Sequence, residues 1–308
     1  MKKFLKNIAL SIVVLPLLYA VLLFVYGLIA PGILRKNMPY GSVKGHLYTR
    51  LQETKTYGAC DVVVLGSSHA YRGFDPRIFK QYGLKMFNLG SSAQTPVQSK
   101  ILVKRHLDKL DPRFVIIETY PAVFQADGVQ PAIDLISNDH IDGEVVWMVL
   151  RMNNIRVLNT LLYGLMRQLL GLEPKVKESK KDQYISGGYV ERTMQVMGDP
   201  IQSKEQKRWS FDSTQVRAFE SLIQMFDQKG IPFILVQAPM SQPFLSQYTN
   251  GEDIDEYFSG LDENYTNFNK VDPFENKYFY SETHLNQKGV EKFNRILLNE
   301  LQQKGLIN

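Results

Sequence analysis

The pattern of apolar and polar residues divides the chain into a long apolar start and a series of short apolar runs. From Ile8 to Ala30, 23 consecutive residues carry no charge. A helix of that length extends about 35 Å at about 1.5 Å per residue, enough to cross a hydrocarbon core of about 30 Å. The pattern therefore predicts a transmembrane helix, with residues 1–36 as a membrane anchor and 37–60 as a stalk.

A cleaved signal peptide is the competing interpretation of this start. Signal peptides have shorter apolar regions that end in a small-x-small cleavage site, and Leu28 two residues before Ala30 fits that pattern poorly. Three lysines precede the apolar run and two basic residues follow it, a bias that places the N-terminus in the cytoplasm. We therefore predict a single-pass membrane protein whose C-terminal domain is extracytoplasmic.

Short apolar runs without alternation follow the stalk, separated by stretches with helical signals. Such runs are typical of parallel strands that are covered on both faces. Helix starts are indicated by Asp75-Pro76 and Thr95-Pro96, and a helix end by Gly230. The sequence predicts an α/β fold with a three-layer, doubly wound parallel sheet over 61–308. The predicted strands are 61–65, 85–89, 113–117, 231–236 and a short fifth at 268–271.

The strand–helix rhythm breaks between 123 and 208, which we interpret as an insertion. Within it, 141–172 has apolar residues at helical spacing, but Arg151 and Arg156 interrupt them and exclude a second membrane span. An amphipathic helical insertion is the main interpretation, and a lid or a helix resting on the membrane is the alternative. The charge-rich residues 175–182 are predicted to form a solvated loop.

Charge and cysteine content narrow the possible functions. The net charge is +5, but residues 1–36 hold five basic residues and no acidic one, so the remainder balances at 31 basic against 31 acidic. No basic footprint for nucleic acid is left. The single cysteine, Cys60, excludes an intrachain disulfide or a cysteine cluster, and no His-x-Glu or paired-carboxylate spacing indicates a metal. We predict neither metal nor cofactor.

The candidate chemistry lies where predicted strands end, because ligands bind beyond the carboxyl ends of parallel strands. The first strand ends in Gly-Ser-Ser-His at 66–69, and a second histidine, His284, precedes the last helix. A serine becomes a useful nucleophile when an imidazole accepts its proton. The N–H groups of Ser68 and Gly90 are candidate donors to an oxyanion.

These blocks resemble the SGNH/GDSL hydrolase family in order and spacing, from about Asp61 to the C-terminus apart from the insertion. The family's Gly-Asp-Ser block resembles 66–68, with Ser67 where Asp is usual. Its second-block glycine resembles Gly90, and its Asp-x-x-His block resembles 281–284. The resemblance implies an SGNH hydrolase-like fold and a serine esterase, with Ser68 as nucleophile and His284 as base.

Two residues of the family pattern are replaced. The third block, which normally supplies an oxyanion-hole asparagine, resembles 118–120 and offers none, so the Tyr120 hydroxyl is a candidate replacement. The aspartate three residues before the histidine is replaced by Ser281, and Glu282 is nearby but points elsewhere if the loop geometry is kept. The resemblance therefore implies a Ser–His dyad in place of a full triad.

Structural roles compete with these assignments. Ser68 could be a turn or capping serine, and His284 could pack at the start of the last helix. His69 is expected to be structural, because its side chain should diverge from that of its neighbour Ser68.

The sequence predicts a membrane-anchored, extracytoplasmic SGNH-type serine esterase or O-acyltransferase. Its expected substrates are acyl esters, including acetyl esters, of an envelope or exported polysaccharide. The chain is similar in this respect to membrane-anchored family members that move acyl groups on cell-envelope polymers. The alternative, favoured by the missing Asn and Asp, is a catalytically inactive SGNH-like protein that binds glycan or scaffolds an envelope assembly.

Overall fold

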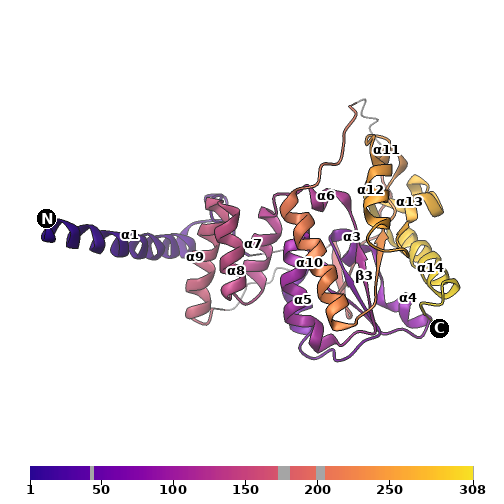
Figure 1. Cartoon of the computed structure of the whole chain (residues 1–308), viewed down its shortest axis with the longest axis horizontal. Coiled ribbons are helices and arrows are strands. Elements are labelled where there is room, and N and C mark those ends of the chain that lie inside the picture. The colour runs from indigo at the N-terminus through magenta and orange to yellow at the C-terminus, as the bar shows by residue number, and fades with distance from the viewer. Residues whose placement is uncertain (42–44, 173–180, 199–204, 308) are drawn as a thin grey trace. The chain divides into compact units, whose positions relative to one another are not determined.

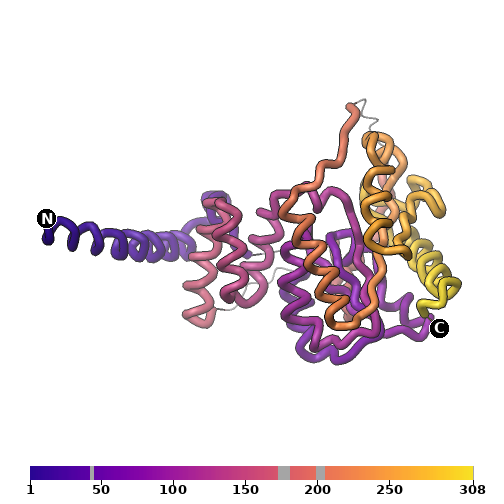
Figure 2. The backbone as a smooth tube through the Cα atoms, in the orientation of Figure 1, coloured from indigo at the N-terminus to yellow at the C-terminus, as the bar shows by residue number. Residues whose placement is uncertain are grey.

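The computed structural model describes residues 1–41, 45–172, 181–198 and 205–307, and its backbone forms two compact units (Figures 1 and 2). The first unit joins Met1–Ser42 with Ala132–Val176. The second joins Val43–Pro131 with Lys177–Asn308 and contains the predicted sheet.

The core of the second unit is a parallel sheet with strand order β2-β1-β3-β6-β7. Helices α5 (Pro96–Leu110) and α10 (Ser213–Lys229) cover one face, and α4 (Pro76–Gln81) and α14 (Gln287–Gln303) cover the other (Figure 1). The predicted α/β fold with a doubly wound parallel sheet is confirmed. The strands are β1 (Val62–Leu65), β2 (Met86–Asn88), β3 (Phe114–Glu118), β6 (Phe233–Gln237) and β7 (Thr266–Asn267).

Local sequence signals place the helix ends. Asp75 accepts a hydrogen bond from the Arg77 N–H and starts α4, while Thr95 and Gln98 form a capping box at the start of α5. Gly230 ends α10 in the left-handed conformation at φ +65°. The prediction of a strand at 268–271 is wrong. Those residues form helix α13 (Phe268–Val271), because the Asn267 side chain caps it by accepting from the Asn269 N–H.

The stalk prediction for 37–60 also differs from the structure. Residues Leu47–Glu53 form helix α2, whose Arg50 is fully buried. The Arg50 guanidinium donates to the Gly188 carbonyl at 2.7 and 2.9 Å and to the Gly45 carbonyl at 2.9 Å. These contacts make α2 part of the second unit.

The predicted insertion 123–208 divides between the two units. Its first residues end α6 (Pro121–Phe124), and 132–176 belong to the first unit. In the second unit, β4 (Asp182–Ile185) and β5 (Tyr189–Arg192) form an antiparallel hairpin. Of the predicted solvated loop, 175–180 lie outside the described residues, and Asp182 is wrongly included, because it starts β4 and forms an ion pair with Arg72.

Short elements complete the second unit. An antiparallel pair of strands, β8 (Phe279–Ser281) and β9 (His284–Leu285), immediately precedes α14. The other short helices are α3 (Ser68–Gly73), α11 (Gln242–Leu245), α12 (Gly251–Ser259) and the 3₁₀ helix Asn276–Tyr278.

The first unit consists of α1 (Lys2–Ile29), α7 (Val129–Asn138, which begins in the second unit), α8 (Gly143–Met152) and α9 (Ile155–Leu169). By length and composition α1 fits a membrane anchor or a signal sequence. The predicted helical stretch 141–172 is two helices, because Asn153 is left-handed at φ +45° and Asn154 caps α9. The Tyr163 ring packs on Gly27, where a Cβ would lie 2.2 Å from it.

Candidate active site

Ser68 lies where β1 turns sharply into α3 at the carboxyl end of the sheet. Gly66 makes the turn at φ +142°, and a Cβ there would lie 2.8 Å from the Glu118 Cβ. Ser67 is the N-cap of α3, and its hydroxyl accepts from the His69 N–H at 3.2 Å. The first helical residue is therefore Ser68, which is partly exposed while Ser67 and His69 are buried.

His284 reaches Ser68 from the start of β9. Its Nε2 lies 2.7 Å from the Ser68 Oγ, although the two residues are 216 positions apart in the sequence. On the other side of the ring, Nδ1 lies 3.0 Å from both the Ser281 Oγ and the Thr283 Oγ1. If the Ser68 hydroxyl donates to Nε2, the ring proton is on Nδ1 and a hydroxyl oxygen accepts it. Two hydroxyl groups, those of Ser281 and Thr283, therefore orient the imidazole.

The surroundings of His284 favour its neutral form. Burial, followed by the charges of Arg72 and Arg192, lowers its pKa from 6.5 to about 4. The ring is therefore free to accept a proton at neutral pH. Among the described residues, no carboxylate lies within hydrogen-bond distance of Nδ1 to stabilise a charged ring.

A group of charged side chains near His284, namely Arg72, Asp182 and Arg192, was not predicted from the sequence. Arg72 donates two hydrogen bonds to Asp182, at 3.0 and 3.2 Å, and Arg192 donates a third at 3.4 Å. The ring of Tyr280 stacks on His284 with centroids 5.5 Å apart. The sequence pattern assigned Asp182 to a solvated loop. For Tyr280, the one signal in the sequence was its position next to Ser281.

Beneath the serine, Ser67, His69 and Glu118 form a buried cluster. The N–H and hydroxyl of Ser67 donate to the Glu118 Oε2 at 3.3 and 3.0 Å. These bonds lower the pKa of Glu118, but burial outweighs them and raises it to about 8. Burial and His284 hold the pKa of His69 well below its usual value. Both groups are neutral at pH 7. The 3.8 Å distance between the His69 Nδ1 and the Glu118 Oε1 therefore does not represent an ion pair.

The other predicted site residues are near the serine, in differing roles. The Gly90 N–H donates to the Asn88 Oδ1 at 3.0 Å, so this candidate oxyanion donor is already engaged. Tyr120 stacks on His69 with centroids 4.0 Å apart, and burial raises the pKa of its hydroxyl, which stays neutral. The carbonyl of Glu282 accepts from the Ser241 N–H at 2.9 Å. The Ser68 N–H has no hydrogen-bond acceptor among the described residues.

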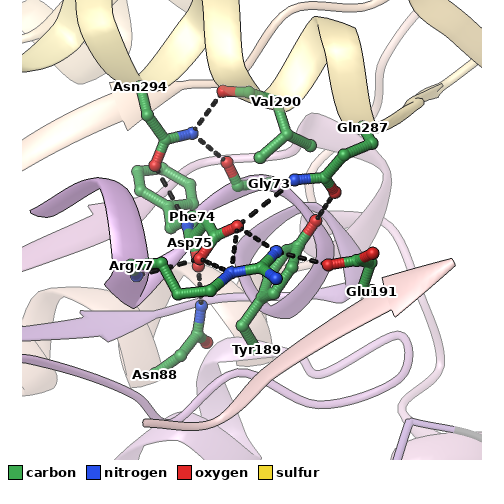
Figure 3. Close-up of polar contacts among 10 residues, drawn as sticks. All are labelled: Gly73, Phe74, Asp75, Arg77, Asn88, Tyr189, Glu191, Gln287, Val290 and Asn294. Atoms are coloured by element: carbon green, nitrogen blue, oxygen red, sulfur yellow. Dashed lines mark hydrogen bonds and ion pairs between the residues drawn. The ribbon is translucent and has the colours of Figure 1, made fainter. Parts of the chain in front are cut away.

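A network of hydrogen bonds fastens α3, which begins with Ser68, to α14, which follows His284 (Figure 3). The Asn294 side chain on α14 donates to the Gly73 carbonyl at 2.6 Å and accepts from the Asp75 N–H at 3.0 Å. Gln287 donates to the Asp75 carboxylate at 3.3 Å and accepts from the Tyr189 hydroxyl at 2.7 Å. The network therefore fixes the end of α3 against α14.

The space at the site is small, and an aromatic cluster lies beside it. A cavity of about 10 Å³, room for about one water molecule, is lined in part by His69, Arg72 and His284. The rings of Trp209 and Tyr248 stack in parallel, 3.6 Å apart, and Trp209 also contacts Tyr120 edge to face at 6.2 Å. Within the described residues, no group of three or more His, Cys, Asp or Glu side chains could hold a metal ion.

No known family model and no curated protein matches the sequence. The solved structures that resemble it include a proposed acylhydrolase from Bacteroides fragilis, at 13% identity, and a GDSL-like lipase from Bacteroides thetaiotaomicron, at 12%. Each match has a TM-score of 0.41 and covers 84% of this chain and 98% of the other. These values are too low for either match to bear on activity.

Proposed function

We propose that the protein is a serine ester hydrolase or O-acyltransferase with Ser68 as nucleophile and His284 as general base. The observation that carries this proposal is the 2.7 Å contact between the Ser68 Oγ and the His284 Nε2. The lowered pKa of His284 supports it as well, because a neutral imidazole is ready to accept the hydroxyl proton.

The reaction follows from these positions. The Ser68 Oγ attacks the ester carbonyl carbon while its proton passes to the His284 Nε2. The bond from that carbon to the alcohol oxygen then breaks, and His284 returns the proton to the leaving oxygen. An acyl-serine remains. Water gives hydrolysis and a sugar hydroxyl gives transfer, and each loses its proton to the His284 Nε2 as it attacks the acyl carbon. The bond from that carbon to the Ser68 Oγ then breaks, and His284 returns the proton to the serine oxygen.

The developing oxyanion needs donors near Ser68. The Ser68 N–H, at the start of α3, is the first candidate, since no described residue accepts from it. Gly90 joins it only if the Asn88 side chain releases the Gly90 N–H. The neutral Tyr120 hydroxyl is the third candidate.

The substrate we propose is an acyl ester on an envelope or exported polysaccharide. The partly exposed residues Tyr120 and Tyr248, whose rings pack on Trp209, support a carbohydrate, because sugar rings stack on aromatic faces. The apolar helix α1 supports a membrane anchor. The basic residues that precede it support a second unit outside the cytoplasm, where envelope-assembly proteins would be its partners.

A non-catalytic, glycan-binding or scaffold role is the second candidate. Two observations favour it: the Gly90 N–H is engaged by Asn88, and the groups of the described residues within hydrogen-bond distance of the His284 Nδ1 are hydroxyls. In that case the aromatic cluster would bind the glycan without ester cleavage.

Ester hydrolysis by the full chain in detergent separates the two candidates. Para-nitrophenyl acetate is offered to the wild type, Ser68→Ala and His284→Ala, with the exposed Ser246→Ala as a matched control. We expect both site variants to lose at least about 10³-fold in rate and the control to keep it. Release of acetate is compared with transfer to an added sugar. A wild-type protein that performs neither reaction favours the binding role.

A further inference from the structure

The first unit contains an open pocket where the chain leaves α1. The pocket has a volume of about 590 Å³, and three of its lining residues are the cations Arg35, Lys36 and Arg156. No acidic residue lines it. Within the part of the chain that the structure describes, none of the three cations forms an ion pair. Three like charges that share a pocket without a counter-ion attract an anion.

Hydrogen bonds hold the walls of this pocket in place. The Asn159 side chain donates to the Asn37 carbonyl at 3.1 Å, and the Thr160 hydroxyl donates to the Pro39 carbonyl at 2.9 Å. Met38 between them is buried at 1% exposure. Arg156 stands at the start of α9, where the Asn154 side chain caps its N–H at 3.0 Å. The pocket is therefore formed before any ligand arrives.

A structural role explains only part of this arrangement. Arg35 donates from Nη1 to the Gly27 carbonyl at 3.4 Å, as a cation at a helix C-terminus often does. Its Nε, however, is buried without a hydrogen-bond partner. The side chains of Lys36 and Arg156 make no hydrogen bond to the described residues. Helix capping therefore leaves most of the positive charge without a function.

The side chains next to the cations indicate which anion the pocket takes. Ile33 and Leu34, just before Arg35, are 75% and 62% exposed, and Ile155, just before Arg156, is 59% exposed. A soluble phosphate would need the cations alone. A phospholipid presents a phosphate directly above acyl chains, so it uses both the cations and the apolar residues. Guanidinium groups match phosphate geometry, and basic pockets beside membrane helices bind anionic headgroups.

We propose that this pocket binds the phosphate of an anionic phospholipid headgroup in the membrane leaflet where α1 ends. Ile29, the last residue of α1, lies three positions before Gly32, the first residue that lines the pocket. The bound lipid would fix the first unit at the membrane surface. The proposal rests on α1 lying in a membrane, and it is independent of ester chemistry at Ser68.

Lipid retention by the full chain tests the proposal. The protein is purified in detergent, mixed with equal amounts of phosphatidylglycerol and phosphatidylcholine, and weighed with its bound lipids by native mass spectrometry. The test variant is Arg35→Gln with Lys36→Gln and Arg156→Gln. The matched control removes three exposed charges from the second unit, through Lys80→Gln, Lys109→Gln and Arg217→Gln.

We expect the wild type and the control to retain phosphatidylglycerol in preference to phosphatidylcholine. In the test variant, the ratio of retained phosphatidylglycerol to phosphatidylcholine should be at least about tenfold lower. Arg156→Gln alone, at an exposed position that leaves the fold intact, should lose part of it. The proposal is overturned if the test variant keeps the preference, or if the wild type retains both lipids equally. It is also overturned if inorganic phosphate displaces phosphatidylglycerol at equal concentration, because the pocket would then take soluble phosphate.

Discussion

Replacing Glu118 by glutamine should make the protein more stable at alkaline pH. The Glu118 carboxyl is buried at the end of β3, where Ser67 donates twice to its Oε2. Its Oε1 has no hydrogen-bond partner among the described residues. Glutamine keeps the shape, and its carbonyl oxygen can accept both bonds from Ser67. The amide carries no charge at any pH.

The magnitude follows from the raised pKa. The folded protein holds the Glu118 proton with a pKa of about 8, against 4.5 for an ordinary glutamate. Because the folded state binds the proton more tightly, the stability due to this group is fully present below pH 4.5. It is lost as the pH rises through 8. At about 1.4 kcal/mol per pH unit, the free energy of unfolding falls by about 5 kcal/mol over that interval.

Thermal unfolding of the full chain in detergent, measured at intervals from pH 4.5 to 8.5, provides the assay. We expect Glu118→Gln to match the wild type at pH 4.5 and to exceed its melting temperature by on the order of 10 °C at pH 8. The exposed Glu263→Gln serves as control and should follow the wild type throughout. A difference between Glu118→Gln and the wild type that stays constant with pH would refute the reasoning, because the pKa of Glu118 would then be the same in the folded and unfolded states.

Three further predictions concern the reacting pair and its support. The rate of ester cleavage should rise with pH through an apparent pKa of about 4 and then stay level to pH 7, because only neutral His284 accepts the serine proton; a rise centred near 6.5 would show that burial does not perturb the ring. Ser281→Asp should place a carboxylate near Nδ1, shift that midpoint upward and raise kcat by about tenfold or more, whereas Ser281→Ala should lower kcat; an unchanged midpoint for the aspartate would contradict the observed orientation. Asn294→Ala should lower the free energy of unfolding by about 3 kcal/mol, because the Gly73 carbonyl and the Asp75 N–H lose their partner. The exposed control Asn299→Ala should lower it by less than about 0.5 kcal/mol. Equal losses for the two variants in urea titrations would mean that the network does not join α3 to α14.

The sheet and the approach of Ser68 to His284 were predictable because both depend on local patterns. Apolar runs of β-branched residues mark the strands, and a glycine at 66 marks the turn that ends β1. Parallel strands bring their carboxyl ends to one edge, so a serine after one strand and a histidine before the last helix meet there. The catalytic role of this pair stays a prediction.

The rest of the site could not be predicted, because it depends on tertiary packing. Arg72, Asp182 and Arg192 meet only when the β4–β5 hairpin folds over α3, and nothing in a charge-rich stretch distinguishes a buried carboxylate from a solvated one. In the sequence, Glu118 drew attention only because its block, 118–120, lacks the asparagine expected for an oxyanion hole. Its role depends on burial at the end of β3, which no spacing in the sequence reports.

The packing of the first unit was likewise hidden from sequence patterns. The Tyr19 hydroxyl of α1 donates to the Asn159 side chain of α9 at 2.7 Å, across 140 residues. An apolar span that looks uniform along the chain therefore carries one face that fits a particular partner helix.

Covalent labelling tests the central claim most directly. The full chain is treated at pH 8 with a fluorophosphonate, which reacts with serine hydroxyls activated by an imidazole, and the modified residue is located by peptide mass spectrometry. We predict a single adduct on Ser68 that is absent from both Ser68→Ala and His284→Ala. Failure of the folded wild-type protein to form an adduct, or an adduct on Ser68 that persists at the same rate in His284→Ala, would contradict the assignment of this pair as nucleophile and base.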